Sequence, residues 1–175
     1  ILCMGNTDND LSSNEYSEKL DGGFLEALIG KSWSLETKND GWILMMNRYR
    51  AVMQNVTDPE LVIFNIHGNS DDYALFRYGL CSCLLDNGYF CYTDIAIGYD
   101  TVVWFDEYNI ELGEAIDAPP YTPWKNGIYR RKFSNGMVLV NPKGNSAQTV
   151  SIEPGYRRFK GTQDPATNNA TEVST

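Results

Sequence analysis

The stretch Asp-Gly-Gly-Phe-Leu-Glu-Ala-Leu, residues 21–28, decides the fold of this chain. A turn-forming Asp-Gly pair opens it, and a short apolar run that holds a single glutamate follows from Gly22. Three comparable runs, at residues 1–5, 61–66 and 89–92, are largely apolar or aromatic and are closed by a polar residue or a glycine. Runs of this kind are typical of parallel strands buried on both faces. We therefore expect a parallel strand in each of the four runs.

Helical periodicity fills two of the gaps between these strands. Apolar residues recur at helical spacing between residues 42 and 53, with polar side chains between them. Asp71 and Asp72 open a second segment whose apolar stripe reaches Leu84, and Asn-Gly at residues 87–88 ends it. Strands that alternate with helices in this way predict an α/β fold with a parallel sheet.

The pattern changes beyond about residue 100, where prolines and glycines separate short apolar runs. Residues 128–133, 137–140 and 149–152 have the composition of antiparallel strands, and Asn-Gly between the first two predicts a hairpin. We expect one domain over residues 1–115 and a small β domain over residues 116–175. The polar, turn-rich end of the chain, from residue 161, is expected to be loosely ordered.

Composition excludes several classes of function. The net charge of −9 and the scattered basic residues do not suit a nucleic-acid partner, which needs a clustered basic surface. No apolar run approaches the length of about 18 residues that a membrane span needs. The spacing of Cys81 and Cys83 does not fit a zinc site, so we expect four buried free thiols, no metal and no cofactor.

Candidate functional residues follow from the rule that parallel α/β proteins place their chemistry at the carboxyl ends of the strands. Five polar residues occupy such positions in the predicted sheet: Asn6, Glu26, Asn65, His67 and Asp94. We expect these side chains to lie near one another at one edge of the sheet.

Glu26 and Asp94 form a candidate catalytic pair. Cleavage of a glycosidic bond needs two carboxyl groups, one to protonate the leaving oxygen and one to act as nucleophile or base. Apolar neighbours of Glu26 predict partial desolvation and a raised pKa, as a general acid requires. A structural carboxylate bonded to backbone or to an arginine fits the same residues equally well.

Substrate contacts are predicted at residues that are rich in polar and aromatic groups. The single histidine, His67, follows an apolar strand, where a hydrogen-bonded structural role is the commoner one. Acidic and aromatic residues crowd residues 104–108, which suits either sugar binding or a loop that plugs the mouth of the sheet. The candidate substrate-binding residues are Asn6, Asn65, His67, Trp104, Asp106 and Glu107.

Several motifs together carry a family resemblance over nearly the whole chain. Residues 21–26 resemble the "DG-x-F-L/I-E/D" strand of TIM-type barrel glycoside hydrolases, and residues 76–90 and 104–113 resemble the last helix, last strand and exit loop. Residues 129–142 and 156–165 are similar to the family's carboxyl-terminal β domain. The chain on these grounds resembles the hypothetical glycosyl hydrolase family 15.

The resemblance implies a (β/α)8 barrel followed by a small antiparallel β-sandwich, of which this chain would hold the carboxyl-terminal half and most of the sandwich. Glu26 would then be a catalytic acid or base acting on an oligosaccharide or polysaccharide, in an extracellular or cell-surface protein. The first half of the barrel would be a missing partner, and the half alone is expected to be unstable, dimeric or aggregation-prone, and inactive.

Two other classes compete with this interpretation. A non-catalytic carbohydrate-binding or cell-surface barrel would keep the aromatic residues without a working pair of carboxylates. An open nucleotide-binding sheet over residues 1–95 is less favoured, because no glycine-rich phosphate-binding motif follows any of the expected strands.

Overall fold

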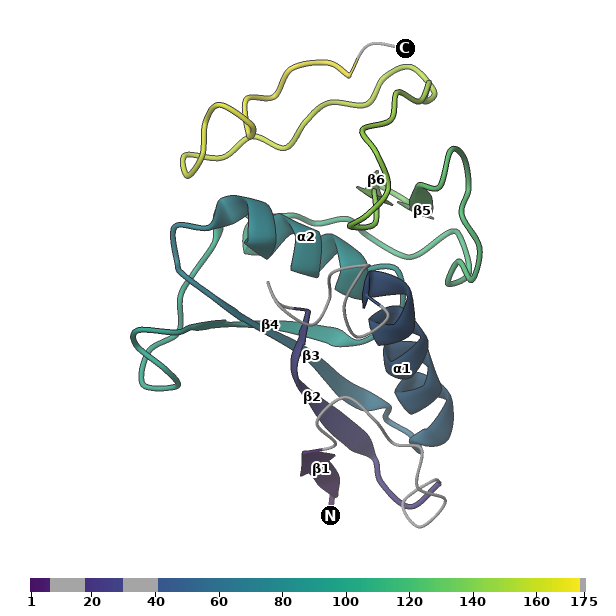
Figure 1. The fold of residues 1–175 in the computed structure, drawn as a ribbon, viewed down its shortest axis with the longest axis vertical. Helices are drawn as coiled ribbons and strands as arrows, with labels where there is room; N and C mark the ends of the chain where they lie inside the picture. The colour runs from purple at the N-terminus through teal and green to yellow at the C-terminus, as the bar shows by residue number, and fades with distance from the viewer. Residues whose placement is uncertain (7–17, 30–40, 174–175) are drawn as a thin grey trace.

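The protein is described by a computed structural model that covers residues 1–6, 18–29 and 41–173. Four strands and two helices form an α/β unit, and a hairpin follows it (Figure 1). In chain order the elements are β1 (Met4–Asn6), β2 (Gly22–Ile29), α1 (Gly41–Asn55), β3 (Leu61–Gly68), α2 (Tyr73–Cys83), β4 (Tyr89–Asp94), the 3-10 helix η1 (Asp106–Asn109), β5 (Tyr129–Phe133) and β6 (Gly136–Val140).

The four strands of the α/β unit form one parallel sheet in the order β1-β2-β3-β4, which confirms the expected α/β fold. Each strand neighbours the next one along the chain, and the described strands contain no reversal of order. Right-handed crossovers between strands in such an order place their helices on one face of the sheet. Doubly wound nucleotide-binding sheets instead bind at a reversal of strand order, which these four strands lack.

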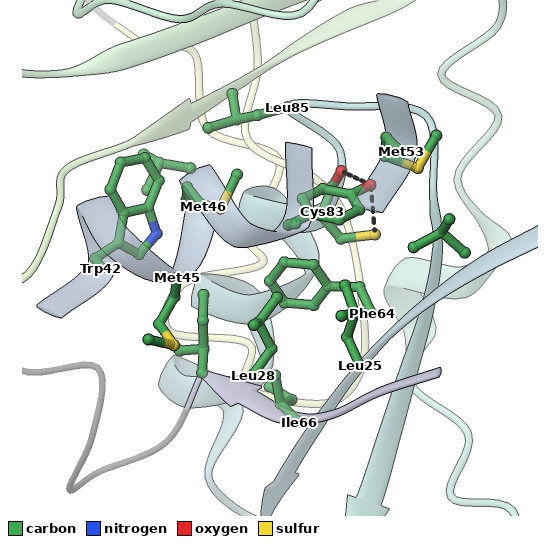
Figure 2. Close-up of a cluster of buried hydrophobic side chains, with 14 of the residues drawn as sticks. Leu25, Leu28, Trp42, Met45, Met46, Met53, Phe64, Ile66, Cys83 and Leu85 are labelled. Atoms are coloured by element: carbon green, nitrogen blue, oxygen red, sulfur yellow. Dashed lines mark hydrogen bonds between the residues drawn. The ribbon is translucent and has the colours of Figure 1, made fainter. Parts of the chain in front are cut away.

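Both helices pack on the same face of the sheet. On α1, the ring of Tyr49 lies edge-on to Phe64 of β3, with ring centroids 4.9 Å apart. On α2, the ring of Phe76 meets Phe90 and Tyr92 of β4, each at 5.7 Å. Successive strand residues point to opposite faces, so these even-numbered residues of β3 and β4 define the covered face. Figure 2 shows part of the buried apolar core beneath it.

Local chemistry explains where α2 begins and how closely it approaches the sheet. The Asp72 carboxylate caps its first turn by accepting a hydrogen bond from the Leu75 amide at 3.1 Å, as the acidic pair in the sequence predicted. Gly79 then faces Ile66 of β3, and a Cβ on it would stand only 2.3 Å from the Ile66 side chain. The glycine therefore permits a helix-to-sheet contact that no larger residue would allow without displacement.

The opposite face of the sheet carries the odd-numbered residues of β3 and β4, together with Glu26 of β2. No helix of the described residues covers this open face, and the side chains of Ile63, His67 and Cys91 are half-buried there. The loop that follows β4 reaches over part of it. Polar groups at the carboxyl end of the sheet therefore remain accessible on this side.

The hairpin β5–β6 packs against α2 and shares the core of the α/β unit through Tyr129, Phe133, Val138 and Val140. Phe133 pairs with Gly136, which confirms the expected hairpin, although the turn is Ser134-Asn135 and Gly136 already belongs to β6. The strand expected over residues 149–152 is wrong, because this segment forms no ladder.

Arg131 of β5 connects the hairpin to the end of α2 by hydrogen bonds. Its side chain is only 3% exposed. The guanidinium donates to the carbonyls of Leu84 and Asp86 at 3.2 and 2.7 Å and to the Asn87 side chain at 2.7 Å. A fourth acceptor is the Asp117 carbonyl at 3.1 Å. These acceptors around one buried cation make the contact between the two parts of the chain specific.

The prediction of a loosely ordered end is wrong for residues 161–173. Asp164 receives a hydrogen bond from Arg77 of α2 at 2.5 Å, and Lys160 forms an antiparallel bridge with Asn169. The last described segment is thus docked on the α/β unit. All four cysteines are free, as predicted, but Cys3 is exposed, so burial of every thiol is wrong.

Candidate active site

Strand β2 is irregular next to the candidate catalytic carboxylate, Glu26. Register with β3 shifts between Leu25 and Ile29, and Ala27 adopts a φ of 49°, which is rare for a residue with a side chain. The freed amide of Ala27 donates to the Asn65 side chain at 3.2 Å. Leu25 is still in register with Phe64 of the covered face, so alternation puts Glu26 on the open face. The bulge, a feature often found beside active sites, lies next to it at the carboxyl end of the strand.

Three side chains surround the Glu26 carboxylate, and together with it they form what we call the carboxylate cluster: Asn6, Glu26, His67 and Tyr99. The Asn6 amide donates to one oxygen of Glu26 at 3.0 Å, and the Tyr99 hydroxyl donates to the other at 3.0 Å. The same hydroxyl lies 3.4 Å from Nε2 of His67. Three strand ends and one loop therefore converge on a single carboxylate.

The prediction of a raised pKa for Glu26 is wrong. Its pKa lies below the ordinary value, because the hydrogen bonds from Asn6 and then from Tyr99 stabilise the charged form. Desolvation opposes them weakly, and the His67 charge adds a smaller lowering effect. Sequence neighbours suggested an apolar environment, but Leu25 and Leu28 belong to the core of the covered face, while Glu26 lies on the open face.

Asn65 lies beneath the carboxylate cluster and is fully buried. Its amide donates to the Thr93 hydroxyl at 2.9 Å, while its carbonyl oxygen accepts the bond from Ala27. Both ends of the side chain are engaged within the sheet. These contacts link the bulge of β2 to β4 through β3, so Asn65 supports the site from below.

Asp94 lies at the carboxyl end of β4, as predicted, and is only 5% exposed. Its carboxylate accepts hydrogen bonds from three backbone amides, those of Ser70 at 2.7 Å, Ala96 at 2.8 Å and Ile97 at 3.1 Å. The amide of Ala96, followed by Ser70, lowers the pKa of Asp94. The side chain thus fixes the turn that carries the loop toward Tyr99.

Asp106 and Glu107 face the end of the chain. The Asp106 carboxylate accepts from the backbone amides of Thr162 and Gln163, the latter at 2.9 Å. Glu107 is 7% exposed and accepts from the Asn168 amide at 2.8 Å. These contacts dock the last segment on η1 and do not bring either residue to the carboxylate cluster.

Trp104 is 59% exposed and lines a pocket of about 430 Å³ along β4. Four successive β4 residues, Phe90 to Thr93, line this pocket with Tyr99, Val102 and Tyr108. Because successive residues point to opposite faces, a pocket that touches all four follows the outer edge of the strand. Tyr99 belongs to both the pocket and the carboxylate cluster and therefore connects them.

Sequence reasoning missed Tyr99. The residue follows Gly98 in a loop without periodicity, and no motif marks it. The available signal was its place just after the last strand, since loops at the carboxyl ends of parallel strands carry function. The described residues hold no group of three or more metal-binding side chains, and none of their helices is long and apolar enough to cross a membrane.

The described residues thus form an α/β protein with a hydrogen-bonded carboxylate at the carboxyl end of its parallel sheet. The chain belongs to the hypothetical glycosyl hydrolase family 15, which it matches over residues 3–137. The match includes the whole α/β unit and reaches the second strand of the hairpin. No curated protein and no solved structure matches the chain.

Proposed function

We propose that this chain is part of a glycoside hydrolase in which Glu26 is one of two catalytic carboxylates. The observation that carries the proposal is the carboxylate cluster. That role agrees with the family match and with the position of Glu26 at the end of a strand. It also agrees with the two hydrogen-bond donors that face the Glu26 carboxylate. The substrate class is an oligosaccharide or polysaccharide.

In the proposed reaction, Glu26 and a second carboxyl group stand on either side of the glycosidic bond. An ionised carboxylate attacks the anomeric carbon or takes a proton from the attacking water, while a protonated carboxylic acid gives its proton to the departing glycosidic oxygen. The pKa of Glu26, held low by Asn6 and Tyr99, suits the first of these roles. Asp94 stays a candidate for the second, although its three backbone contacts favour a role in shaping the loop.

We further propose that the sheet is the carboxyl-terminal half of a (β/α)8 barrel, formed by residues 1–115. A consecutive parallel order with both helices on one face is the arrangement that closes into a barrel. The open face would become the barrel interior. The pocket of about 430 Å³ along the edge of β4 is where a further strand would pair.

Residues 116–175 would form the β-sandwich accessory domain. The hairpin β5–β6 and the antiparallel bridges Arg157–Glu172 and Lys160–Asn169 support this part of the proposal. A second pocket, of about 520 Å³, lies between β6 and the last segment and is lined by apolar residues including Leu139, Ile152 and Phe159. A sandwich needs a second sheet packed on such a surface.

The test is hydrolysis by the full-length protein of a panel of polysaccharides, measured as released reducing ends. Replacing Glu26 with Gln keeps the size of the side chain and removes its charge, so turnover should fall at least about a thousandfold. The matched control is Glu114→Gln, at an exposed glutamate on the loop before the hairpin. Equal turnover in the wild type and in Glu26→Gln would contradict the proposal.

A non-catalytic carbohydrate-binding protein is the second candidate, and the exposed aromatic rings favour it. Tyr99, which belongs to the carboxylate cluster, and Trp104, which lines the same pocket as Tyr99, are 67% and 59% exposed, and such rings stack on sugars. Binding of a polysaccharide without hydrolysis by either the wild type or Glu26→Gln would select this candidate.

A further inference from the structure

We propose that Tyr99 is a positioning residue whose hydroxyl, together with the Asn6 amide, fixes the Glu26 carboxylate as a hydrogen-bond acceptor. Glu26 is then the nucleophile or base of the reaction and is excluded from the role of proton donor. This inference rests on the proposed function and specifies which of the two carboxylate roles Glu26 fills.

The geometry carries the first step. Each oxygen of Glu26 faces a donor at 3.0 Å, the amide of Asn6 on one side and the hydroxyl of Tyr99 on the other. An ionised carboxylate accepts at both oxygens, whereas a protonated one must present its own O–H to an acceptor. Donors on both sides therefore favour the charged form and orient its plane.

His67 is a second polar group within reach of the Tyr99 hydroxyl. A hydroxyl has one proton to donate and lone pairs that accept. If the proton of Tyr99 goes to Glu26, Nε2 of His67, 3.4 Å from the tyrosine oxygen, can bond to that oxygen only when Nε2 carries a proton. The rings of Tyr99 and His67 meet edge-on, with their centroids 6.2 Å apart.

Among the described residues, few ionisable groups face Glu26. Of these, His67 of β3 and Tyr99 of the loop act on its pKa, and Asn6 of β1 adds a neutral donor. The pKa of Tyr99 is itself raised, first by desolvation and then by its bond to Glu26. A tyrosine with a raised pKa keeps its proton and so remains a donor across the pH range of the reaction.

A purely structural role for Tyr99 makes a different prediction. Its side chain is 67% exposed, so the ring contributes little to the core. Anchoring the loop would change the amount of folded protein without changing the pKa of Glu26. The titration of Glu26 therefore separates the two roles.

The experiment is a carbon-13 NMR titration of glutamate carboxyl groups in the full-length protein, with the Glu26 signal assigned by its loss in Glu26→Gln. Tyr99→Phe should raise the pKa of Glu26 by about 0.5 to 1 unit, because the charged form loses a donor in a partly exposed setting. Asn6→Ala should raise it in the same direction. The matched control is Tyr121→Phe, since Tyr121 is 56% exposed and its hydroxyl accepts a bond from Gln54 at 2.8 Å.

Kinetics complete the test. The acid limb of the pH profile of kcat/KM should move to higher pH in Tyr99→Phe by the same amount, with kcat/KM lower by about tenfold and Tyr121→Phe unchanged. An unchanged Glu26 titration in Tyr99→Phe would overturn the positioning role. If Tyr99→Phe shifts the titration of Glu26 but the wild-type protein hydrolyses no polysaccharide, the proposed function and the catalytic role of Glu26 are overturned. The effect of Tyr99 on the pKa of Glu26 would still be established.

Discussion

The two faces of the parallel sheet differ in the polarity of their side chains, although alternating residues of the same strands form both. Phe64 and Ile66 point to the covered face, where both are fully buried between the sheet and the helices. Asn65 and His67, one position along, point to the open face and bond to polar groups. The covered face contributes stability, and the open face carries the groups that could react. A single strand therefore serves both purposes because its side chains alternate.

The largest expected effect is a loss of stability on the covered face. Phe64→Ala removes a fully buried ring that meets Tyr49, and should lower the free energy of unfolding by about 3–5 kcal/mol. Ile63→Ala, its half-buried neighbour on the open face, should cost about 1 kcal/mol. Chemical denaturation of the two variants measures the difference. Similar losses would contradict the division between the faces.

Thiol labelling compares the faces without mutation. Cys83 is buried among the helices, where desolvation raises the pKa of its thiol to about 12, while Cys91 is half-buried on the open face. In the chain of residues 1–175, iodoacetamide should modify Cys91 at least about tenfold faster than Cys83. The proposed barrel would cover Cys91 when closed, so its closure predicts slower labelling of Cys91 in the full-length protein. Unchanged labelling in the two forms would count against barrel closure.

The smallest expected effect concerns Asp94, whose bonds stabilise one loop. Its folded pKa lies below the unfolded value, so its contribution is present above the unfolded pKa and is lost as pH falls through the folded one. Asp94→Asn should therefore lower Tm by about 2–4 °C at neutral pH and by less near pH 3. Thermal scans at the two pH values measure this. An equal decrease at both would show that charge is not involved.

Sequence patterns were sufficient for the strands and helices of the α/β unit, for the hairpin and for the strand-end residues, but not for residues 149–152. Asp72 caps α2 and the Ser-Asn turn joins β5 to β6, because both depend on neighbours in the chain. The end positions of Asn6 and Glu26 followed from the apolar runs before them, and a parallel sheet brought them together.

Contacts between distant segments could not be predicted in this way. The partners of Asp106 lie more than fifty residues further along, at Thr162 and Gln163, and no periodicity links them. Tyr99 reaches Glu26 across 73 positions because the Asp94 turn directs its loop. The lowered pKa of Glu26 depends on two donors that are distant in sequence, Asn6 and Tyr99. Its apolar sequence neighbours therefore predicted a pKa shift in the wrong direction.

Chemical rescue of Glu26→Ala in the full-length protein tests the central claim most directly. Removing the carboxylate should abolish polysaccharide hydrolysis, and sodium formate, a small carboxylate that fits the vacated space, should restore part of it. Formate should give no rescue to the parallel variant Asp94→Ala, whose defect lies in the loop. Hydrolysis by Glu26→Ala at the wild-type rate without formate would contradict the claim that Glu26 is the reacting carboxylate.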